Sequence, residues 1–271
     1  ESLVLSPDGG RMACLVEGRI IAQETRNGRL LLSTPVLPGE VWGPDRLRFL
    51  DARTLRFYGA RLQGGRTDFR VVDFDLAGGQ RAREIRVPGY DHALRAISPD
   101  GQRLLLRDRR LEPSRAEIAI ADLRTGGPPV PLPVRGILSG LAFLTDGRVA
   151  AAWRNRGRIE LRLFDGRGRE LKRFDLPGEH VRLGGQPAPG LLALATTESR
   201  SIQEGWRSDL LDLETGAVRP IGEGLYPQGS PGLPPGSVGT LLFVQEQGGL
   251  VRIDPATGRH TAILRSESQA L

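Results

Sequence analysis

The chain has 271 residues, of which 39% are hydrophobic, 36 are glycine and 20 are proline. This composition is typical of a folded, turn-rich protein and excludes an intrinsically disordered one, and no apolar run approaches the ~18 residues of a membrane span. The single cysteine, Cys14, excludes an internal disulfide. It lies in an apolar run, so we expect a buried small hydrophobic residue that leaves the redox compartment undecided.

The formal net charge is +6, and Lys172 is the only lysine among 38 basic residues. One explanation is codon bias in a GC-rich genome. The other is a surface selected for planar, bidentate recognition of carboxylate or phosphate, which lysine serves less well. Composition alone does not separate them. The sequence begins at Glu1 without a methionine, which leaves open a leader or anchor outside it.

A short turn motif recurs along the whole chain. Its copies are Ser6–Gly9, Gly43–Arg46, Ser98–Gly101, Leu144–Gly147, Pro187–Gly190 and Leu233–Gly236, with a mean spacing of about 45 residues. A second motif, mostly Asp-x-x-x-Gly, ends at Gly28, Gly79, Gly126, Gly168, Gly216 and Gly258, with a mean spacing of about 46. Two independent markers therefore count six repeats of one size.

Each repeat reads as four short strands. Aspartate and proline begin tight turns, glycine supplies the positive φ that completes them, and the residues between turns favour strands. Second strands are predicted at 103–106, 148–153 and 191–196, third strands at 118–121, 159–164 and 250–253, and outer strands at 81–87 and 260–264. No segment has helical periodicity with caps.

The predicted fold is therefore all-β, a six-bladed β-propeller with four antiparallel strands per blade. We expect one domain over residues 1–271, with blades at approximately 1–34, 35–88, 89–134, 135–178, 179–224 and 225–271. The second blade has an expanded gap of 55 residues, from Arg46 to Gly101.

Ring closure is the unusual point of this prediction. Residues 3–5 read as the innermost strand of the first blade and 260–264 as the outermost strand of the last. No spare strand is visible to complete another blade, so we expect closure by face-to-face packing of the first and sixth blades. The alternative is a seventh blade or a partner strand outside this sequence.

The repeat resembles a known family. The phrases "SPDGQR" from Ser98 and "IADLRTGG" about twenty residues later are similar to the TolB-type, WD-repeat-like β-propeller repeat. The resemblance covers essentially the whole chain, although the fifth and sixth blades lack the Pro-Asp pair. It implies an extracytoplasmic protein, periplasmic or membrane-associated, that binds other envelope proteins. Composition does not separate this location from a cytoplasmic one.

The sequence contains no recognisable catalytic motif. Ser139, Ser230 and Ser237 do not lie in a G-x-S-x-G elbow, and the recurring aspartates read as turn formers. His92 and His180 each lie early in an inner strand, where they either line the channel or share a ligand; His260 is in an outer strand. We expect channel lining. The prediction is no catalytic residue, no metal and no cofactor.

Long loops joining second and third strands are the distinctive feature. They are predicted at 61–68, 107–117 and 197–209. Acidic residues are interspersed among their arginines, so a solvated, self-paired face is one reading. The other is a docking face with Trp206 as its anchor, because tryptophan and arginine dominate interface energetics. The predicted partner-binding residues are Arg107, Arg109, Arg110, Arg115, Arg154, Arg156, Arg158, Arg200, Trp206 and Arg207.

The predicted function is a non-catalytic interaction or scaffold module. Its expected partner is an acidic protein surface or a subunit of a membrane complex, and anionic lipid headgroups are a further option. Nucleic acid is not expected, because no aromatic series interleaves with the arginines. The alternative is a propeller enzyme or small-ligand sensor that uses the channel mouth around His92 and His180.

Overall fold

The computed structural model describes residues 2–36, 40–41, 46–63, 66–87, 92–108, 118–133, 137–155, 158–186, 188–198, 205–227, 241–245, 249–254 and 259–265. The chain divides into two compact units. Unit 1 comprises Glu1–Arg110 and Ala119–Val130, and unit 2 comprises Leu111–Ile118 and Pro131–Leu271. Within the described residues, no helix is long and apolar enough to cross a membrane.

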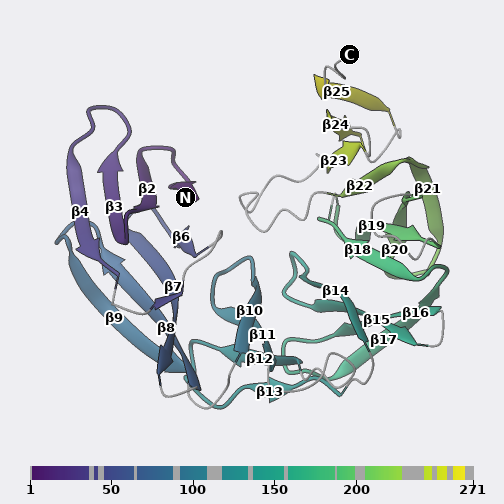
Figure 1. The fold of residues 1–271 in the computed structure, drawn as a ribbon, viewed down its shortest axis with the longest axis horizontal. Coiled ribbons are helices and arrows are strands. Elements are labelled where there is room, and N and C mark those ends of the chain that lie inside the picture. Colours follow the sequence, from purple (N-terminus) through teal and green to yellow (C-terminus); the bar gives the residue numbers. More distant parts are fainter. Residues whose placement is uncertain are drawn as a thin grey trace. The chain divides into compact units, whose positions relative to one another are not determined.

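The first three sheets are antiparallel and follow one another along the chain (Figure 1). The first contains β1 (Ser2–Leu5), β2 (Arg11–Val16), β3 (Arg19–Glu24) and β4 (Leu30–Pro35). The second contains β5 (Glu40–Val41), β6 (Leu47–Phe49), β7 (Thr54–Gln63), β8 (Arg66–Asp75) and β9 (Gln80–Val87). The third contains β10 (His92–Ile97), β11 (Arg103–Asp108), β12 (Ile118–Asp122) and β13 (Val130–Pro131).

The other three sheets repeat this plan. The fourth contains β14 (Ile137–Phe143), β15 (Val149–Asn155), β16 (Arg158–Phe164) and β17 (Glu170–Leu176). The fifth contains β18 (His180–Leu183), β19 (Leu191–Thr197), β20 (Arg207–Asp212) and β21 (Val218–Glu223). The sixth contains β22 (Leu225–Pro227), β23 (Leu241–Gln245), β24 (Gly249–Ile253) and β25 (His260–Arg265).

These sheets confirm the predicted fold class, an all-β, six-bladed propeller of antiparallel sheets, of which five have four strands and the second has five. Each sheet is made from consecutive strands, so β1 pairs with β2 and β25 pairs with β24. Within the described residues, the first sheet contains only β1 to β4 and the sixth only β22 to β25.

The second blade departs from the prediction in two ways. It has five strands, because its inner strand is divided into β5 and β6, which both pair with β7. The predicted first turn at Gly43–Arg46 falls on residues of which 43–45 lie outside the described ones. The turn that joins β6 to β7 lies at residues 50–54, where the Leu50 N–H donates to the Thr54 carbonyl.

This position of the turn removes the expanded gap. In the first and third blades, the N–H that closes the turn belongs to Ser6 and Ser98. Leu50 occupies their position, so Arg53 corresponds to the turn glycine and precedes Gly101 by 48 residues. The sequence pattern was misleading because Pro44-Asp45 imitates the motif while the real turn, Asp51-Ala-Arg-Thr, contains neither proline nor glycine.

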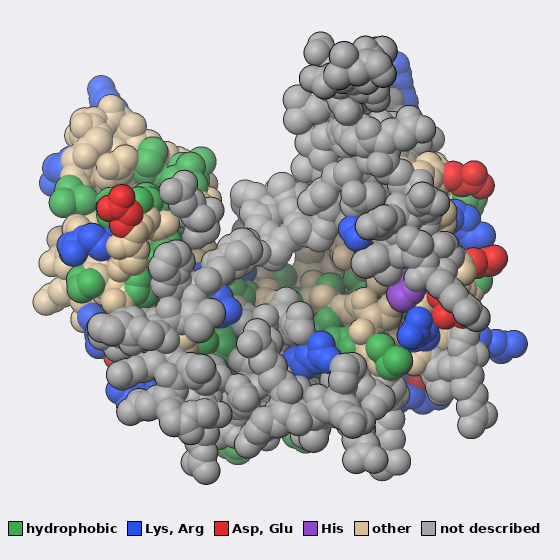
Figure 2. Space-filling view, in the orientation of Figure 1, with side chains coloured by type: hydrophobic (Ala, Val, Ile, Leu, Met, Phe, Trp, Pro, Cys, Tyr) green, Lys and Arg blue, Asp and Glu red, His purple; other side chains and the backbone are tan. Residues whose placement is uncertain are grey.

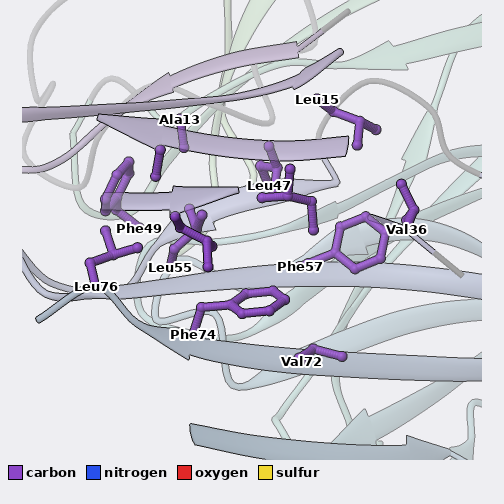
Figure 3. Close-up of a cluster of buried hydrophobic side chains, with 13 residues drawn as sticks. Ala13, Leu15, Val36, Leu47, Phe49, Leu55, Phe57, Val72, Phe74 and Leu76 are labelled. Atoms are coloured by element: carbon purple, nitrogen blue, oxygen red, sulfur yellow. The ribbon is translucent and has the colours of Figure 1, made fainter. Parts of the chain in front are cut away.

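Apolar faces of neighbouring sheets form the core. Figure 3 shows Ala13 and Leu15 of β2 directed toward β6 and β7, which contribute Leu47, Phe49, Leu55 and Phe57. All of these side chains are almost fully buried. These apolar side chains recur at every second residue, because successive side chains of a strand point to opposite faces of the sheet. Each sheet therefore directs apolar side chains toward each neighbouring sheet of its unit.

The first turn is held by the same hydrogen bonds in the first and third blades. The Ser98 hydroxyl donates to Asp100 Oδ1 at 2.5 Å and accepts the Arg103 N–H at 2.8 Å. Ser6 makes the equivalent bonds to Asp8 and Arg11 at 2.6 and 2.9 Å. The motif recurs because serine, aspartate and glycine together satisfy the backbone of this chain reversal.

Guanidinium groups of the second blade bind the first turn of the third. Arg48 donates to the Ser98 carbonyl at 2.8 Å and also to the Pro99 carbonyl. The buried Arg56 donates to the Gly101 carbonyl at 2.5 Å, while its other nitrogens bind both carboxylate oxygens of Asp73 at 2.6 and 2.7 Å. Arg11 of the first blade likewise donates to the Ala52 carbonyl in the second. The carbonyl groups of the turn are therefore also hydrogen-bond acceptors for arginines of the preceding blade.

The Asp-x-x-x-Gly turns join third and fourth strands, as predicted. Gly126 and Gly216 have φ of 62° and 80°, and their N–H groups donate to the Asp122 and Asp212 carbonyls. The aspartate side chains accept backbone N–H bonds two residues further along the chain. Gly258 lies outside the described residues.

The first prediction concerns Gly126. A Cβ there would meet no atom within 4 Å, so Gly126→Ala tests the positive φ alone. We expect a loss of about 1–2 kcal/mol in the free energy of unfolding, measured by urea denaturation. Gly127→Ala is the matched control, since Gly127 has no positive φ and only Thr125 is nearby. Equal effects of the two substitutions would contradict the assignment.

The second prediction concerns the buried ion pair. Arg56→Leu leaves the Asp73 carboxylate without its guanidinium partner, while the Gly101 carbonyl keeps the bond from the Tyr58 hydroxyl. We therefore expect a loss of about 3–5 kcal/mol in unfolding free energy, mainly from the uncompensated charge. The double variant Arg56→Leu with Asp73→Leu should recover part of that loss, because it removes the uncompensated charge. A double variant less stable than Arg56→Leu would show that Asp73 does not depend on Arg56.

Candidate interaction site

Unit 2 brings several predicted residues to one end of the fourth and fifth blades. Arg154 and Arg158 lie at the end of the β15–β16 hairpin, and Arg207 begins β20 opposite Thr196 of β19. The two blades share one apolar core cluster, which includes Leu161 and Leu194. Both hairpin ends are where the second strand connects to the third, as expected for the predicted face.

A direct contact links the two ends. Arg154 lies 3.4 Å from the Glu179 carboxylate, and both side chains are about one-third exposed. The Glu179 N–H donates to the Thr197 carbonyl at 2.8 Å. Gly178 packs against the same strand so closely that a Cβ would lie 2.9 Å from that carbonyl oxygen. The connection between the blades therefore holds Arg154 in place.

Arg207 lies above a buried acid. Its Nε donates to Asp209 Oδ2 at 3.2 Å, and its side chain is 48% exposed whereas that of Asp209 is 3% exposed. Burial raises the pKa of Asp209, and the bond from Arg207 offsets this only in part. A molecule approaching this end meets the guanidinium, not the carboxylate. Arg158 is also exposed.

The structure corrects the interpretation of Trp206. The side chain is 2% exposed, and the Arg182 guanidinium lies 5.0 Å from its ring centroid. The indole is part of the chain's own packing, so it does not offer an exposed anchor at a loop tip. The sequence could not show this, because the covering arginine comes from another strand.

The other predicted residues divide between described and undescribed parts. Arg107 is half-buried in β11 and belongs to unit 1. The predicted loop at 61–68 is instead a continuation of the β7–β8 hairpin, in which Arg61 pairs with Asp68 and Gln63 with Arg66. Outside the described residues lie Arg109, Arg110, Arg115, Arg156 and Arg200.

The histidine and serine candidates that the structure describes are each placed by their own strands, and Ser230 and Ser237 lie outside the described residues. His180 is half-buried at the start of β18 and pairs with Thr197, and His92 pairs with Asp108 in the third blade. The Ser139 hydroxyl accepts the Val181 N–H at 3.2 Å, so it links two inner strands. In the part of the chain that the structure describes, no group of three or more histidine, cysteine or acidic residues could hold a metal ion.

Charge on the visible surface is mixed. Figure 2 shows blue and red side chains interspersed over the coloured part of each unit. On the outer strands of the fourth blade, Arg162 and Arg173 each contact both Glu160 and Glu170. Arg162 and Arg173 lie outside the predicted loops. Among the predicted residues, Arg154 and Arg207 also have acidic partners, and Arg158 and Arg207 are exposed.

The fold is that of a β-propeller, and comparisons with known proteins agree. No protein-family model matches the chain, and no curated protein matches it. Among solved structures it is similar to a puromycin hydrolase mutant complexed with PGG, with 17% identity over 99% of this chain and 45% of that one and a TM-score of 0.68.

Two further structures are informative. The β-propeller domain of the Trilobed protease from Pyrococcus furiosus, described as having an open velcro topology, shares 16% identity over 80% of this chain and 69% of its own, with a TM-score of 0.56. TolB from Acinetobacter baumannii shares 18% identity over 95% and 64%, with a TM-score of 0.51. At these identities the likeness shows the fold. The chain spans less than half the length of the puromycin hydrolase, 45%.

The third prediction uses two aspartates whose pKa values shift in opposite directions. Burial would raise the pKa of Asp100, but hydrogen bonds from Ser98 and the Gln102 N–H outweigh it and lower the pKa. Asp100 therefore stabilises the fold above the unfolded pKa, and this is lost as the pH falls through the folded value. The raised pKa of Asp209 has the opposite effect on stability. Ionisation of Asp209 disfavours folding, and this penalty disappears below the unfolded pKa.

At pH 7, Asp100→Asn should therefore lower the melting temperature, whereas Asp209→Asn should raise it or leave it unchanged. Both differences from the unsubstituted chain should shrink as the pH approaches 3. Thermal melts from pH 7 to pH 3 measure this. Two shifts of the same sign at pH 7 would contradict the assigned environments.

Proposed function

We propose that this chain is a non-catalytic, TolB-like β-propeller interaction module that docks onto an acidic surface of a protein in a membrane-associated complex. The observation that carries the proposal is the exposure of Arg158 and Arg207 at one end of neighbouring blades, each from a separate hairpin. Arg154 lies in the same hairpin end as Arg158 and is held by Glu179. Arginine suits this role because its planar guanidinium binds a carboxylate in a bidentate manner.

An extracytoplasmic location is part of the same proposal. It rests on the likeness to TolB and on the repeat phrases that resemble that family. A second candidate is favoured by the comparison with puromycin hydrolase, of which this chain matches only 45%. In that case the chain would be the propeller part of a larger hydrolase, and its partner would be a catalytic domain.

The fourth prediction tests the docking surface. Arg158→Glu combined with Arg207→Gln should reduce capture of the native partner from membrane extracts at least about tenfold, because charges at an interface rim steer association. Capture by the unsubstituted chain should also weaken as salt rises. Quantitative mass spectrometry after pull-down measures both.

The matched control is Arg167→Glu with Arg169→Gln, two exposed arginines of the β16–β17 turn, one of which pairs with Asp165. Both double variants change the charge by the same amount. Undiminished capture by the Arg158/Arg207 variant, at an unchanged melting temperature, would place the docking surface elsewhere. Recovery of a hydrolase domain as the main partner would favour the second candidate.

A further inference from the structure

The last strand of the second blade differs from the other outer strands in charge. β9, with the sequence QRAREIRV, carries three arginines and one glutamate, a net charge of +2. The net charge is zero in each of β4, β13, β17 and β21, and it is +1 in β25. Codon bias alone does not explain this, because β17 balances its two basic residues with two acidic ones.

The geometry around Glu84 shows the same imbalance. Its carboxylate is shared by Arg81 at 2.6 Å, Arg86 at 3.1 Å and Arg70 at 3.6 Å. Burial would raise the pKa of Glu84, but the bond from Arg86 and the charges of its neighbours lower it, so the group is ionised. The side chains of Arg81 and Arg86 are 48% and 79% exposed. One carboxylate therefore neutralises only one of these positive charges.

The backbone of β9 offers a second element of recognition. β9 ends its sheet, so one edge of the strand pairs with β8, and no described strand pairs with the other edge. At eight residues it is the longest of the six outer strands that the structure describes. An edge of this length presents alternating N–H and C=O groups to which an extended chain can pair.

We propose that the outer edge of β9 binds an extended segment of a partner protein that carries aspartate or glutamate at alternate positions. The segment adds a strand to the second blade. Its acidic side chains, which recur on one face every two residues, pair with Arg81 and Arg86. The inference rests on the proposed role as an interaction module, and it names a surface separate from Arg158 and Arg207.

A charged edge can also serve only to prevent aggregation. The two readings predict different results with a labelled ten-residue peptide of alternating glutamate and threonine. If the edge accepts a strand, fluorescence anisotropy should show saturable binding. A peptide of alternating glutamate and proline has the same charge but fewer N–H donors, and we expect it to bind at least about tenfold more weakly.

The fifth prediction assigns the contact to β9. Arg81→Glu with Arg86→Glu should weaken binding of the glutamate–threonine peptide at least about tenfold, and Arg167→Glu with Arg169→Glu less than about twofold. If charge reversal beside Glu84 impairs folding, the milder double variant Arg81→Gln with Arg86→Gln replaces it in the same binding assay. Bound peptide should also slow amide hydrogen exchange in residues 80–87.

Several outcomes would overturn the inference: no saturable binding, equal binding of the proline peptide, equal loss in the Arg167/Arg169 control, or unchanged exchange in β9. The assay uses a synthetic peptide and no native partner. Its failure is therefore distinct from a failure of the pull-down, which tests the proposed function.

Discussion

Hydrogen bonds from guanidinium groups to turn carbonyls connect the blades of the first unit. The carbonyl oxygens of the first turn of the third blade accept bonds both from within the third blade and from the second blade. Arg48 and Arg56 donate to Ser98, Pro99 and Gly101, while the Ser98 carbonyl also accepts the Gly101 N–H and the Gly101 carbonyl the Tyr58 hydroxyl. The turn sequence is thus constrained twice, by the chain reversal it makes and by the acceptors it must present.

This interaction changes how the arginine content is understood. Arg56 donates to one carbonyl and both oxygens of one carboxylate at once, which requires the forked, planar donor set of a guanidinium. A lysine ammonium could not span the same acceptors. The single lysine is used differently: Lys172 donates to the Glu214 carbonyl and lies 5.5 Å from the Phe174 ring centroid. Part of the arginine excess is therefore structural.

The sequence predicted a feature correctly where the interaction that determines it lies within a few residues, and incorrectly where that interaction comes from a distant strand. Gly126 and Gly216 were identifiable because positive φ is a local demand that glycine meets best. The first turn of the second blade was not, because Pro44-Asp45 carries the local signal while the pairing of β6 with β7 decides the register. The Trp206 ring is buried and contacts Arg182 of another strand, and nothing within a few residues of Trp206 indicates that contact.

Arginines at the blade ends bind two kinds of acceptor. At the first-turn end, Arg11, Arg48 and Arg56 bind backbone carbonyls, which are fixed by the fold, although Arg56 also binds Asp73 and Arg148 binds Asp146. At the opposite end, where second strands pass to third strands, Arg154 and Arg207 bind carboxylates. A carboxylate on another protein can compete for those guanidinium groups without breaking the backbone structure, whereas a turn carbonyl has no such substitute. An arginine bound only to turn carbonyls is therefore committed to the fold, whereas one bound to a carboxylate can exchange that partner; Arg169, which pairs with Asp165, belongs to the second kind as well.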